Sequence, residues 1–299
     1  MTPTGARPLR FGLIGVDSAH SVQFTRLLGD GRTAAVPGGT IVGAWRGPTV
    51  ADFPPSRDRN DQLAAEVAGL GVPLLDSPEA VAEASDALLV VASDSRTHPG
   101  YLRRLGRYGR PVYVDTRFAP TRREAVQVLE HATADGCLVL AGSPKRFTPE
   151  FRGALTAAGD AERIDLDGPL PEQPHHPFLA WYGVHLVDLA VAAFGPDCAS
   201  VDASGDRVTL TWADGRIAVL GGDAEWHPVT RGVIDSPTGS HAFAIESSAE
   251  MLVGLLASIV SACRSGIPTV PPAEIVATVA IVEAAARSRA LGRPVALPR

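Results

Sequence analysis

The stretch that most constrains the fold is the first hydrophobic run, residues 9–16, together with the turn after it. The run lacks polar alternation, which predicts a strand buried on both faces. Apolar residues at helical spacing follow over residues 21–28. A strand, a tight turn and a helix in immediate succession are typical of a dinucleotide-binding unit, whose helix N-terminus binds a diphosphate. The fingerprint G-x-G-x-x-G is altered, because Gly15, Asp17 and His20 occupy its three glycine positions.

The altered turn has an electrostatic consequence. A carboxylate at Asp17 repels a diphosphate at the point where a glycine backbone would approach it. Two interpretations of the turn stay open. Either Asp17 and His20 form an Asp–His pair that orients a ligand without any nucleotide, or Asp17 or Ser18 caps the first N–H groups of the helix.

Strands and helices alternate through the rest of the first half. Strands are predicted at 40–45, 86–92, 111–115 and 137–141, and helices at 61–70, 77–83, 98–107 and 121–133. This alternation predicts an α/β fold with a parallel, doubly wound sheet of Rossmann type. A sixth strand cannot be assigned to any segment. The loop at 47–60 is long and rich in proline, which favours a binding or lid role.

The second half has a different pattern. Helices are predicted at 180–194, 248–264 and 272–291, and a hairpin at 207–222 that turns at an Asp-Gly pair. These elements predict an α+β domain with an open antiparallel sheet. We therefore expect a Rossmann dinucleotide-binding-like domain at 1–147 and a substrate and dimerisation domain at 148–299, with the C-terminal segment free to pack back on the first domain.

Composition narrows the class of partner. The net charge of −6 and the pI near 5.7 argue against a nucleic-acid or membrane partner and leave a small-molecule substrate. Cys137, Cys198 and Cys263 are too widely spaced for a disulfide framework or a zinc site, and no histidine spacing matches a metal site, so no metal is expected. No leader peptide or membrane span is visible, which predicts a cytoplasmic protein.

Several motifs together resemble the Gfo/Idh/MocA oxidoreductases. They are G-L-I-G-V at 12–16, A-S-D-S-R-T-H at 92–98, V-D-T-R-F-A at 114–119, G-S-P-K-R-F at 142–147, G-V-H-L-V-D at 183–188 and the tail at 264–297. The resemblance covers nearly the whole chain. It implies a Rossmann domain followed by an open antiparallel sheet, in a homodimer or homotetramer. It also implies hydride transfer between NAD or NADP and a carbon of a small sugar, polyol or cyclitol.

The departures from the family pattern fall on its proton-transfer residues. The family uses the Lys of its E-K-P segment and the His of its G-x-H segment, and this chain has Thr116 at the Lys position. The acidic residue that the family carries four positions before the His is Trp181 here. His185 and Asp188 remain, and their spacing places both on one helix face.

Two segments also resemble a subgroup of the same family. Residues 15–20 (G-V-D-S-A-H) match its first turn, G-L-D-x-S-H, and residues 53–59 (F-P-P-S-R-D-R) match its second-strand loop. The resemblance implies that Asp17 and His20 are a trait of that subgroup.

The predicted catalytic residues lie at or near the family's proton-transfer positions: His185, Asp188, Arg117, Thr116 and Lys145. A neutral imidazole at His185 takes a proton from a carbinol as the hydride leaves, although a structural histidine that docks its helix is the alternative. Thr116 cannot act as an acid or base, and Arg117 can only stabilise charge. Lys145 follows the last strand of the first domain and is a candidate for the vacated lysine role.

The predicted cofactor contacts lie at strand ends and in the turns that follow them: Gly15, Asp17, Ser18, His20, Arg46, Ser93, Ser95, His98 and Asp115. Arg46 stands where an NAD-specific protein carries an acidic residue, which favours NADP over NAD. The predicted walls of the substrate pocket are Trp181, Tyr182 and His176.

Three functions stay open at this stage. The first is an NAD(P)-dependent oxidoreductase with an altered site. The second is the same fold repurposed, without a cofactor, for acid–base chemistry of the lyase, isomerase or cyclase type. The third is a non-catalytic ligand-binding or regulatory protein. The loss of two proton-transfer residues favours the third, whereas the retention of His185 and Asp188 argues against it.

Overall fold

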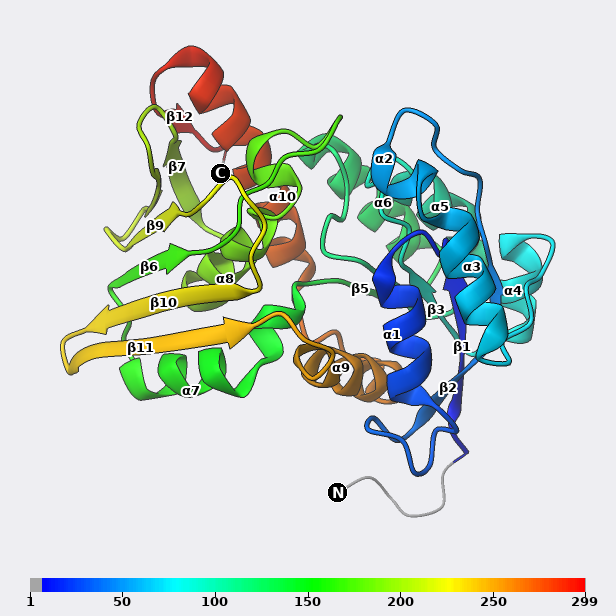
Figure 1. The fold of residues 1–299 in the computed structure, drawn as a ribbon. Coiled ribbons are helices and arrows are strands. Elements are labelled where there is room, and N and C mark those ends of the chain that lie inside the picture. The colour runs from blue at the N-terminus through cyan, green and yellow to red at the C-terminus, as the bar shows by residue number, and fades with distance from the viewer. Residues whose placement is uncertain (1–6, 299) are drawn as a thin grey trace. The chain divides into compact units, whose positions relative to one another are not determined.

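The computed structural model describes residues 7–298 (Figure 1). They divide into two compact units. Unit 1 consists of the described part of Met1–Ala119 with Glu124–Ala141 and Leu252–Val270; unit 2 consists of Pro120–Arg123, Gly142–Met251 and the described part of Pro271–Arg299. The domain boundary predicted after residue 147 stays a prediction.

Unit 1 is built on a parallel sheet whose strand order within the described residues is β2-β1-β3-β4-β5. The strands are β1 (Leu9–Ile14), β2 (Gly39–Trp45), β3 (Ala87–Val90), β4 (Val112–Val114) and β5 (Val139–Leu140). The central strand β3 is wholly buried, because all four of its residues are apolar. The predicted doubly wound parallel sheet is confirmed.

A short segment around Leu74 lies beside β2, in the place of a sixth strand. Leu74 forms an isolated parallel bridge with Ala44. The amide of Ala44 donates to the carbonyl of Pro73 at 3.0 Å, and the amide of Leu75 donates to the carbonyl of Ala44 at 2.8 Å. This contact extends the sheet to the six-strand order of dinucleotide-binding folds. It was not predicted, because so short a segment carries no hydrophobic periodicity.

Helices surround this sheet. They are α1 (Ala19–Leu28), α2 (Pro54–Arg57), α3 (Asn60–Gly69), α4 (Pro78–Ala84), α5 (His98–Leu105), η1 (Gly106–Tyr108), α6 (Arg122–Ala134) and α9 (Met251–Ser265). The helix α4 begins as predicted, with Ser77 as its N-cap. The helix α2 lies inside the predicted loop at 47–60, where the Ser56 hydroxyl accepts the amide of Val50 at 3.1 Å. The helix α9 joins unit 1 through Arg264, which donates to the carbonyl of Gly38 at 3.2 Å.

Unit 2 contains a sheet with the order β11-β10-β6-β9-β8-β7-β12 in the described residues. Its strands are β6 (Arg163–Asp167), β7 (Cys198–Asp202), β8 (Val208–Trp212), β9 (Ile217–Gly221), β10 (Val229–Ser236), β11 (Gly239–Glu246) and β12 (Val295–Ala296). The predicted hairpin is β8–β9 and is confirmed. The sheet is mixed, whereas an antiparallel sheet was predicted, because β6 pairs in parallel with β9. The hairpin β10–β11 was not predicted, since exposed alanines weaken the alternation along β11.

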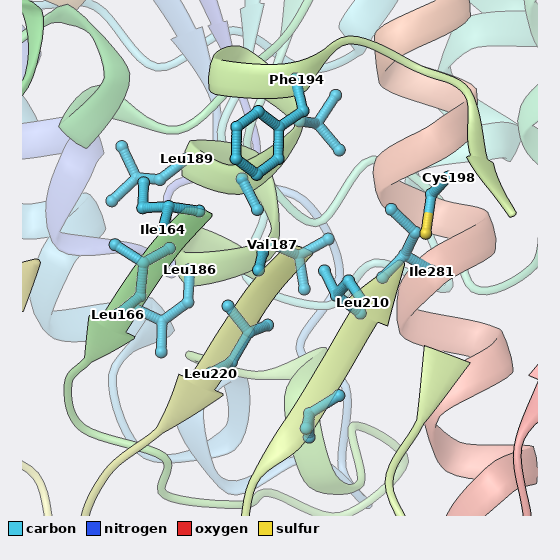
Figure 2. Packing of buried hydrophobic residues seen from close by; sticks show 14 of the residues in the cluster. Ile164, Leu166, Leu186, Val187, Leu189, Phe194, Cys198, Leu210, Leu220 and Ile281 are labelled. Atoms are coloured by element: carbon cyan, nitrogen blue, oxygen red, sulfur yellow. The ribbon is translucent and has the colours of Figure 1, made fainter. Parts of the chain in front are cut away.

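One face of this sheet is covered by helices, and the residues between them form a single hydrophobic core. The helices of unit 2 are η2 (Pro144–Phe147), α7 (Pro149–Ala158), η3 (Phe178–Ala180), α8 (Val184–Phe194) and α10 (Pro272–Leu291). Figure 2 shows Leu186 and Leu189 of α8 against Ile164 and Leu166 of β6. Since α8 is apolar on nearly every side, its first turn is also buried. His185 and Asp188 in that turn are therefore held inside unit 2.

Candidate functional site

The turn after β1 is closed against the end of β3. Gly15 has a φ of +75°, and a Cβ at this position would lie 2.6 Å from the Cβ of Ala92, so only glycine fits. The carboxylate of Asp17 accepts the amide of Ser93 at 2.7 Å, and the Ser93 hydroxyl donates to the carbonyl of Asp17 at 2.9 Å. Asp17 is only 4% exposed. Its charge therefore faces a backbone N–H of its own unit.

The capping interpretation of this turn is confirmed for Ser18, whose hydroxyl accepts the amide of His20 at 3.3 Å. The proposed pair between Asp17 and His20 is wrong in its partner. The His20 ring pairs instead with Asp115, which follows β4, and its Nδ1 lies 3.1 Å from Oδ2 of that carboxylate. The ring also stacks on Phe24, with 5.2 Å between the centroids.

Asp115 is buried and surrounded by donors. Its Oδ1 accepts the Tyr113 hydroxyl at 3.2 Å and the Thr116 amide at 2.9 Å, and Arg117 lies 3.6 Å from Oδ2. Burial alone would raise the pKa of Asp115, but the neighbouring His20 and Arg117 hold that pKa far below its ordinary value. The carboxylate is therefore charged at any working pH. We call Asp17, His20, Ser93 and Asp115 the unit 1 cluster.

The loop after β3 contains three of the predicted cofactor residues. Ser93 is buried but meets Arg59, whose guanidinium donates to the Ser93 hydroxyl at 3.3 Å. Ser95 is buried, and its carbonyl accepts the amide of His98 at 3.3 Å. The ring of His98 is fully buried, with Nε2 2.7 Å from the carbonyl of Ala92, and burial lowers its pKa. His98 thus supports the loop from inside.

Arg46 lies at the end of β2, and its side chain is 43% exposed. Its guanidinium forms an ion pair with Asp61, whose side chain is more exposed still, and donates to the Thr49 hydroxyl at 3.3 Å. The pairing is solvent-accessible and therefore weak. A second arginine, Arg96, bonds both Asp52 and Asp94 and so ties the 47–60 loop to the loop after β3. No sequence pattern predicted this link.

Unit 2 contains a second polar group around the start of α8. Nδ1 of His185 lies 2.8 Å from the hydroxyl of Ser143, and the amide of Ser143 donates to the carboxylate of Asp188 at 3.1 Å. Arg146 reaches Asp188 at 3.4 Å and Glu274 at 2.5 Å. Burial raises the pKa of Asp188, although Arg146 and the Ser143 amide oppose that rise. Ser143, Arg146 and Glu274 were not predicted as site residues.

Lys145 lies in the same turn and is the sole lysine of the chain. Its ammonium donates to the Ser247 hydroxyl at 3.0 Å, and the residue is 3% exposed. This burial lowers the pKa of Lys145 to about 8. Its amide donates to the Ser143 hydroxyl at 3.3 Å. We call Ser143, Lys145, Arg146, His185 and Asp188 the unit 2 cluster.

The predicted pocket walls form an aromatic chain that ends at His185. His176, Trp181, Tyr182 and His185 contact one another in sequence as edge-to-face rings, with centroids 5.6 to 6.0 Å apart. His176 and Trp181 are buried. Before Trp181, His175 in the loop and Phe178 at the start of η3 adopt positive φ values of 64° and 51°. Such strain in residues other than glycine is typical of functional loops.

The structure thus brings the predicted residues together within each unit. Gly15, Asp17, Ser18, His20, Ser93 and Asp115 converge in unit 1, and Lys145, His185 and Asp188 converge in unit 2. Within residues 7–298, no group of three or more His, Cys, Asp and Glu side chains could hold a metal ion. The helices in this part of the chain are too short or too polar to cross a membrane.

Comparison with known proteins gives few sequence matches. No family model matches the chain. Inositol 2-dehydrogenase 4 of Saccharopolyspora erythraea is 31% identical over 147 residues, which cover 48% of this chain and 39% of that protein. The chain spans less than half the length of the relatives it matches by sequence.

Solved structures match over nearly the whole chain. A myo-inositol dehydrogenase from Corynebacterium glutamicum has a TM-score of 0.80 and 17% identity, and the match covers 98% of this chain and all of the other. An oxidoreductase from Agrobacterium radiobacter, solved with NAD+, L-tartaric acid and magnesium, has a TM-score of 0.78 and 15% identity over 97% of this chain and 98% of the other. These matches confirm that the chain has the two-domain fold of the Gfo/Idh/MocA-type dehydrogenases.

Proposed function

We propose that this protein is an NAD(P)-dependent dehydrogenase that oxidises a hydroxyl of a small sugar, polyol or cyclitol, or reduces the matching carbonyl. The observation that carries the proposal is the unit 2 cluster, in which a buried ring, that of His185, is fixed at the start of a helix by Ser143. Enzymes place an imidazole in this way where a hydroxyl proton has to be exchanged. The fold and the inositol dehydrogenase among its relatives support the same reaction class.

The residues of unit 1 fit a dinucleotide despite the altered fingerprint. Asp17 points its charge toward the Ser93 amide, which reduces its repulsion of a diphosphate near the N-terminus of α1. Ser93 and Ser95 lie at the end of β3 and Arg46 at the end of β2, where such a ligand binds a doubly wound sheet. When bound, the nicotinamide ring supplies the hydride acceptor. Unit 1 binds and orients it.

We assign His185 the contact with the reacting oxygen of the substrate. The Ser143 hydroxyl accepts the amide of Lys145, and we assign its own proton to a hydrogen bond with Nδ1 of His185. In that arrangement the ring proton is on Nε2, which donates a hydrogen bond to the substrate oxygen. Asp188 and Arg146 hold the turn in place. This role differs from the proton acceptor expected from the sequence.

The other predicted residues of unit 2 have supporting roles. Lys145 presents a positive charge inside unit 2 that stabilises negative charge on substrate oxygens. Trp181 and Tyr182 form an apolar wall against a sugar or cyclitol ring, and His176 buttresses Trp181. Thr116 and Arg117 in unit 1 shape the surroundings of Asp115.

Arg46 supports a preference for NADP. Its guanidinium is partly exposed and its ion pair with Asp61 is at the surface, so a 2′-phosphate can take the place of that carboxylate. The uncovered face of the unit 2 sheet supports assembly into a homodimer or homotetramer. It exposes Ala242 and Ala244 of β11 beside Arg231 of β10, and these residues help to line a groove of about 630 Å³.

The test has two steps. Calorimetric titration of nucleotide-free protein with NAD+, NADH, NADP+ and NADPH is expected to give at least one micromolar dissociation constant. Nicotinamide absorbance is then followed with myo-inositol and a panel of hexoses and polyols. His185→Asn should abolish turnover without loss of nucleotide affinity, whereas His131→Asn on the exposed face of α6 should have no effect. Absence of binding at millimolar nucleotide would refute the proposed function.

A further inference from the structure

A histidine and a buried carboxylate meet in the unit 1 cluster, although 95 residues separate them in the sequence. Nδ1 of His20 lies 3.1 Å from Oδ2 of Asp115. The Asp115 side chain is 1% exposed and that of His20 is 19% exposed. One end of the pair is thus inside the unit and the other end is open to a ligand.

The surroundings of Asp115 fix the direction of this hydrogen bond. Tyr113, Thr116 and Arg117 supply donors or positive charge to the carboxylate, which therefore stays ionised and can only accept. His20 must then donate its Nδ1 proton to Asp115. In the neutral ring this leaves the lone pair on Nε2. Stacking on Phe24 holds the plane of the ring.

The position of Asp115 in the sequence indicates a role for the pair in proton transfer. Asp115 directly precedes Thr116, which stands where the family resemblance places a proton-transferring lysine. A threonine hydroxyl cannot replace that amine as a base. The carboxylate beside it instead holds an imidazole that comes from the first turn of α1. An acid–base group is therefore present next to the vacated position, supplied by another element.

We propose that His20 is the proton acceptor for the reacting hydroxyl and that Asp115 is its positioning residue. The proposal rests on the proposed dehydrogenase function. In the oxidation, the hydroxyl proton passes to Nε2 of His20 as the carbonyl forms. A bound oxidised nicotinamide dinucleotide would supply the acceptor for the hydride that leaves the carbinol carbon. The imidazolium then releases its proton to solvent.

Two other roles for these residues predict different results. If the pair only holds α1 against the end of β4, its loss lowers the stability of the fold, and turnover does not depend on the nucleophilicity of the His20 ring. If Lys145 is the proton acceptor, turnover depends on Lys145 and survives substitution of His20. The experiment therefore compares His20→Gln, Asp115→Asn and Lys145→Met, with His131→Gln as the matched control on the exposed surface of α6.

The first readout needs no substrate. Diethyl pyrocarbonate acylates imidazole nitrogens that carry a lone pair, and peptide mass spectrometry assigns the sites. In nucleotide-free protein we expect His20 to react and the fully buried His98 to stay unmodified. Asp115→Asn should slow the reaction of His20 severalfold, because the preferred tautomer is no longer held. A His20 that is inert in the folded wild-type protein would overturn the proposal.

The second readout uses the substrate found in the test of the proposed function. His20→Gln is expected to lower kcat by about a hundredfold or more. The dissociation constant of the nucleotide should stay within about threefold of the wild-type value. In a second variant, His20→Ala, added imidazole should restore part of the rate. Full turnover in a folded His20→Gln variant would overturn this inference and leave the dehydrogenase function standing. Absence of turnover in the wild type with every substrate would instead overturn the dehydrogenase function, and this inference with it.

Discussion

The hydroxyl of Ser143 lies 2.8 Å from Nδ1 of His185, while the amide of the same serine bonds Asp188. One residue thus contacts both polar side chains at the start of α8. The two contacts can be separated experimentally, because the side chain of Ser143 makes the contact to His185 and its backbone amide makes the contact to Asp188.

Ser143→Ala removes the contact to His185 and keeps the amide bond to Asp188. A neutral hydrogen bond contributes about 1 kcal/mol, so we expect kcat to fall about fivefold and the free energy of unfolding to fall by about 1 kcal/mol. Steady-state kinetics and urea unfolding measure the two effects. Ser204→Ala, which removes a hydroxyl bond to Asp202 at the surface, is the control. Unchanged kcat in Ser143→Ala would contradict the assigned tautomer of His185.

Lys145 predicts a specific pH dependence of stability. Its pKa in the folded protein is about 8, below the ordinary value of about 10.4. Between these values the unfolded chain binds more protons than the folded one, so this residue's contribution to the unfolding free energy rises with pH, by about 3 kcal/mol in all. Below pH 8 both states are protonated and the burial penalty is constant.

Lys145→Met removes this titration. At pH 7 the variant should be more stable than the wild type by about 2 kcal/mol, since it loses the burial penalty and one hydrogen bond. The difference should shrink and reverse as the pH rises toward 10. Urea unfolding of both proteins at pH 7 and pH 9.5 measures it. A stability difference that does not change with pH would show that the ammonium is solvated.

The pair between Arg46 and Asp61 predicts the choice of nucleotide. Arg46→Met should weaken NADP+ binding by roughly ten- to a hundredfold, the range of one charge-assisted hydrogen bond, and leave NAD+ binding unchanged. Asp61→Asn should strengthen NADP+ binding several-fold, because the competing carboxylate is gone. Asp58→Asn, at an exposed ion pair with Arg57 in the same loop, is the control. Equal effects on both nucleotides would remove Arg46 from the 2′-phosphate site.

The closed turn at Gly15 predicts a large loss of stability on substitution. In Gly15→Ala the added methyl group collides with Ala92 and the backbone stays in a left-handed conformation, so the unfolding free energy should fall by about 2–4 kcal/mol. Gly71→Ala has a similar φ of +87° and nothing within 4 Å, and should lose only about 1 kcal/mol. Similar losses in both variants would show that Ala92 moves aside without strain.

Local patterns predicted much of the fold. The buried runs at β1 and β3 and the Asp-Gly turn between β8 and β9 follow from periodicity and turn chemistry. The hairpin β10–β11 and the mixed pairing of β6 with β9 depend on contacts between distant segments, which no local pattern contains. The isolated bridge at Leu74 involves too few residues to produce any pattern.

The same limit applies to the candidate residues. His185 and Asp188 were found because their spacing on one helix is local. Of the two interpretations left open for the turn, the pair of Asp17 with His20 is wrong, because the nearest carboxylate in the sequence is Asp17 and the one in space is Asp115. His98 is fully buried in the fold, which its place in a loop motif did not indicate. Whether these residues act as predicted in binding and catalysis stays a prediction.

Every cationic side chain of this protein except one is an arginine, and the exception, Lys145, is buried. Amine-directed reagents therefore meet one side chain and the N-terminal amine. Since Lys145 has to leave its burial to be modified, its labelling rate measures the local opening of the segment that contains it. The protein thus contains a natural reporter of conformational fluctuation, readable by mass spectrometry without any engineered label.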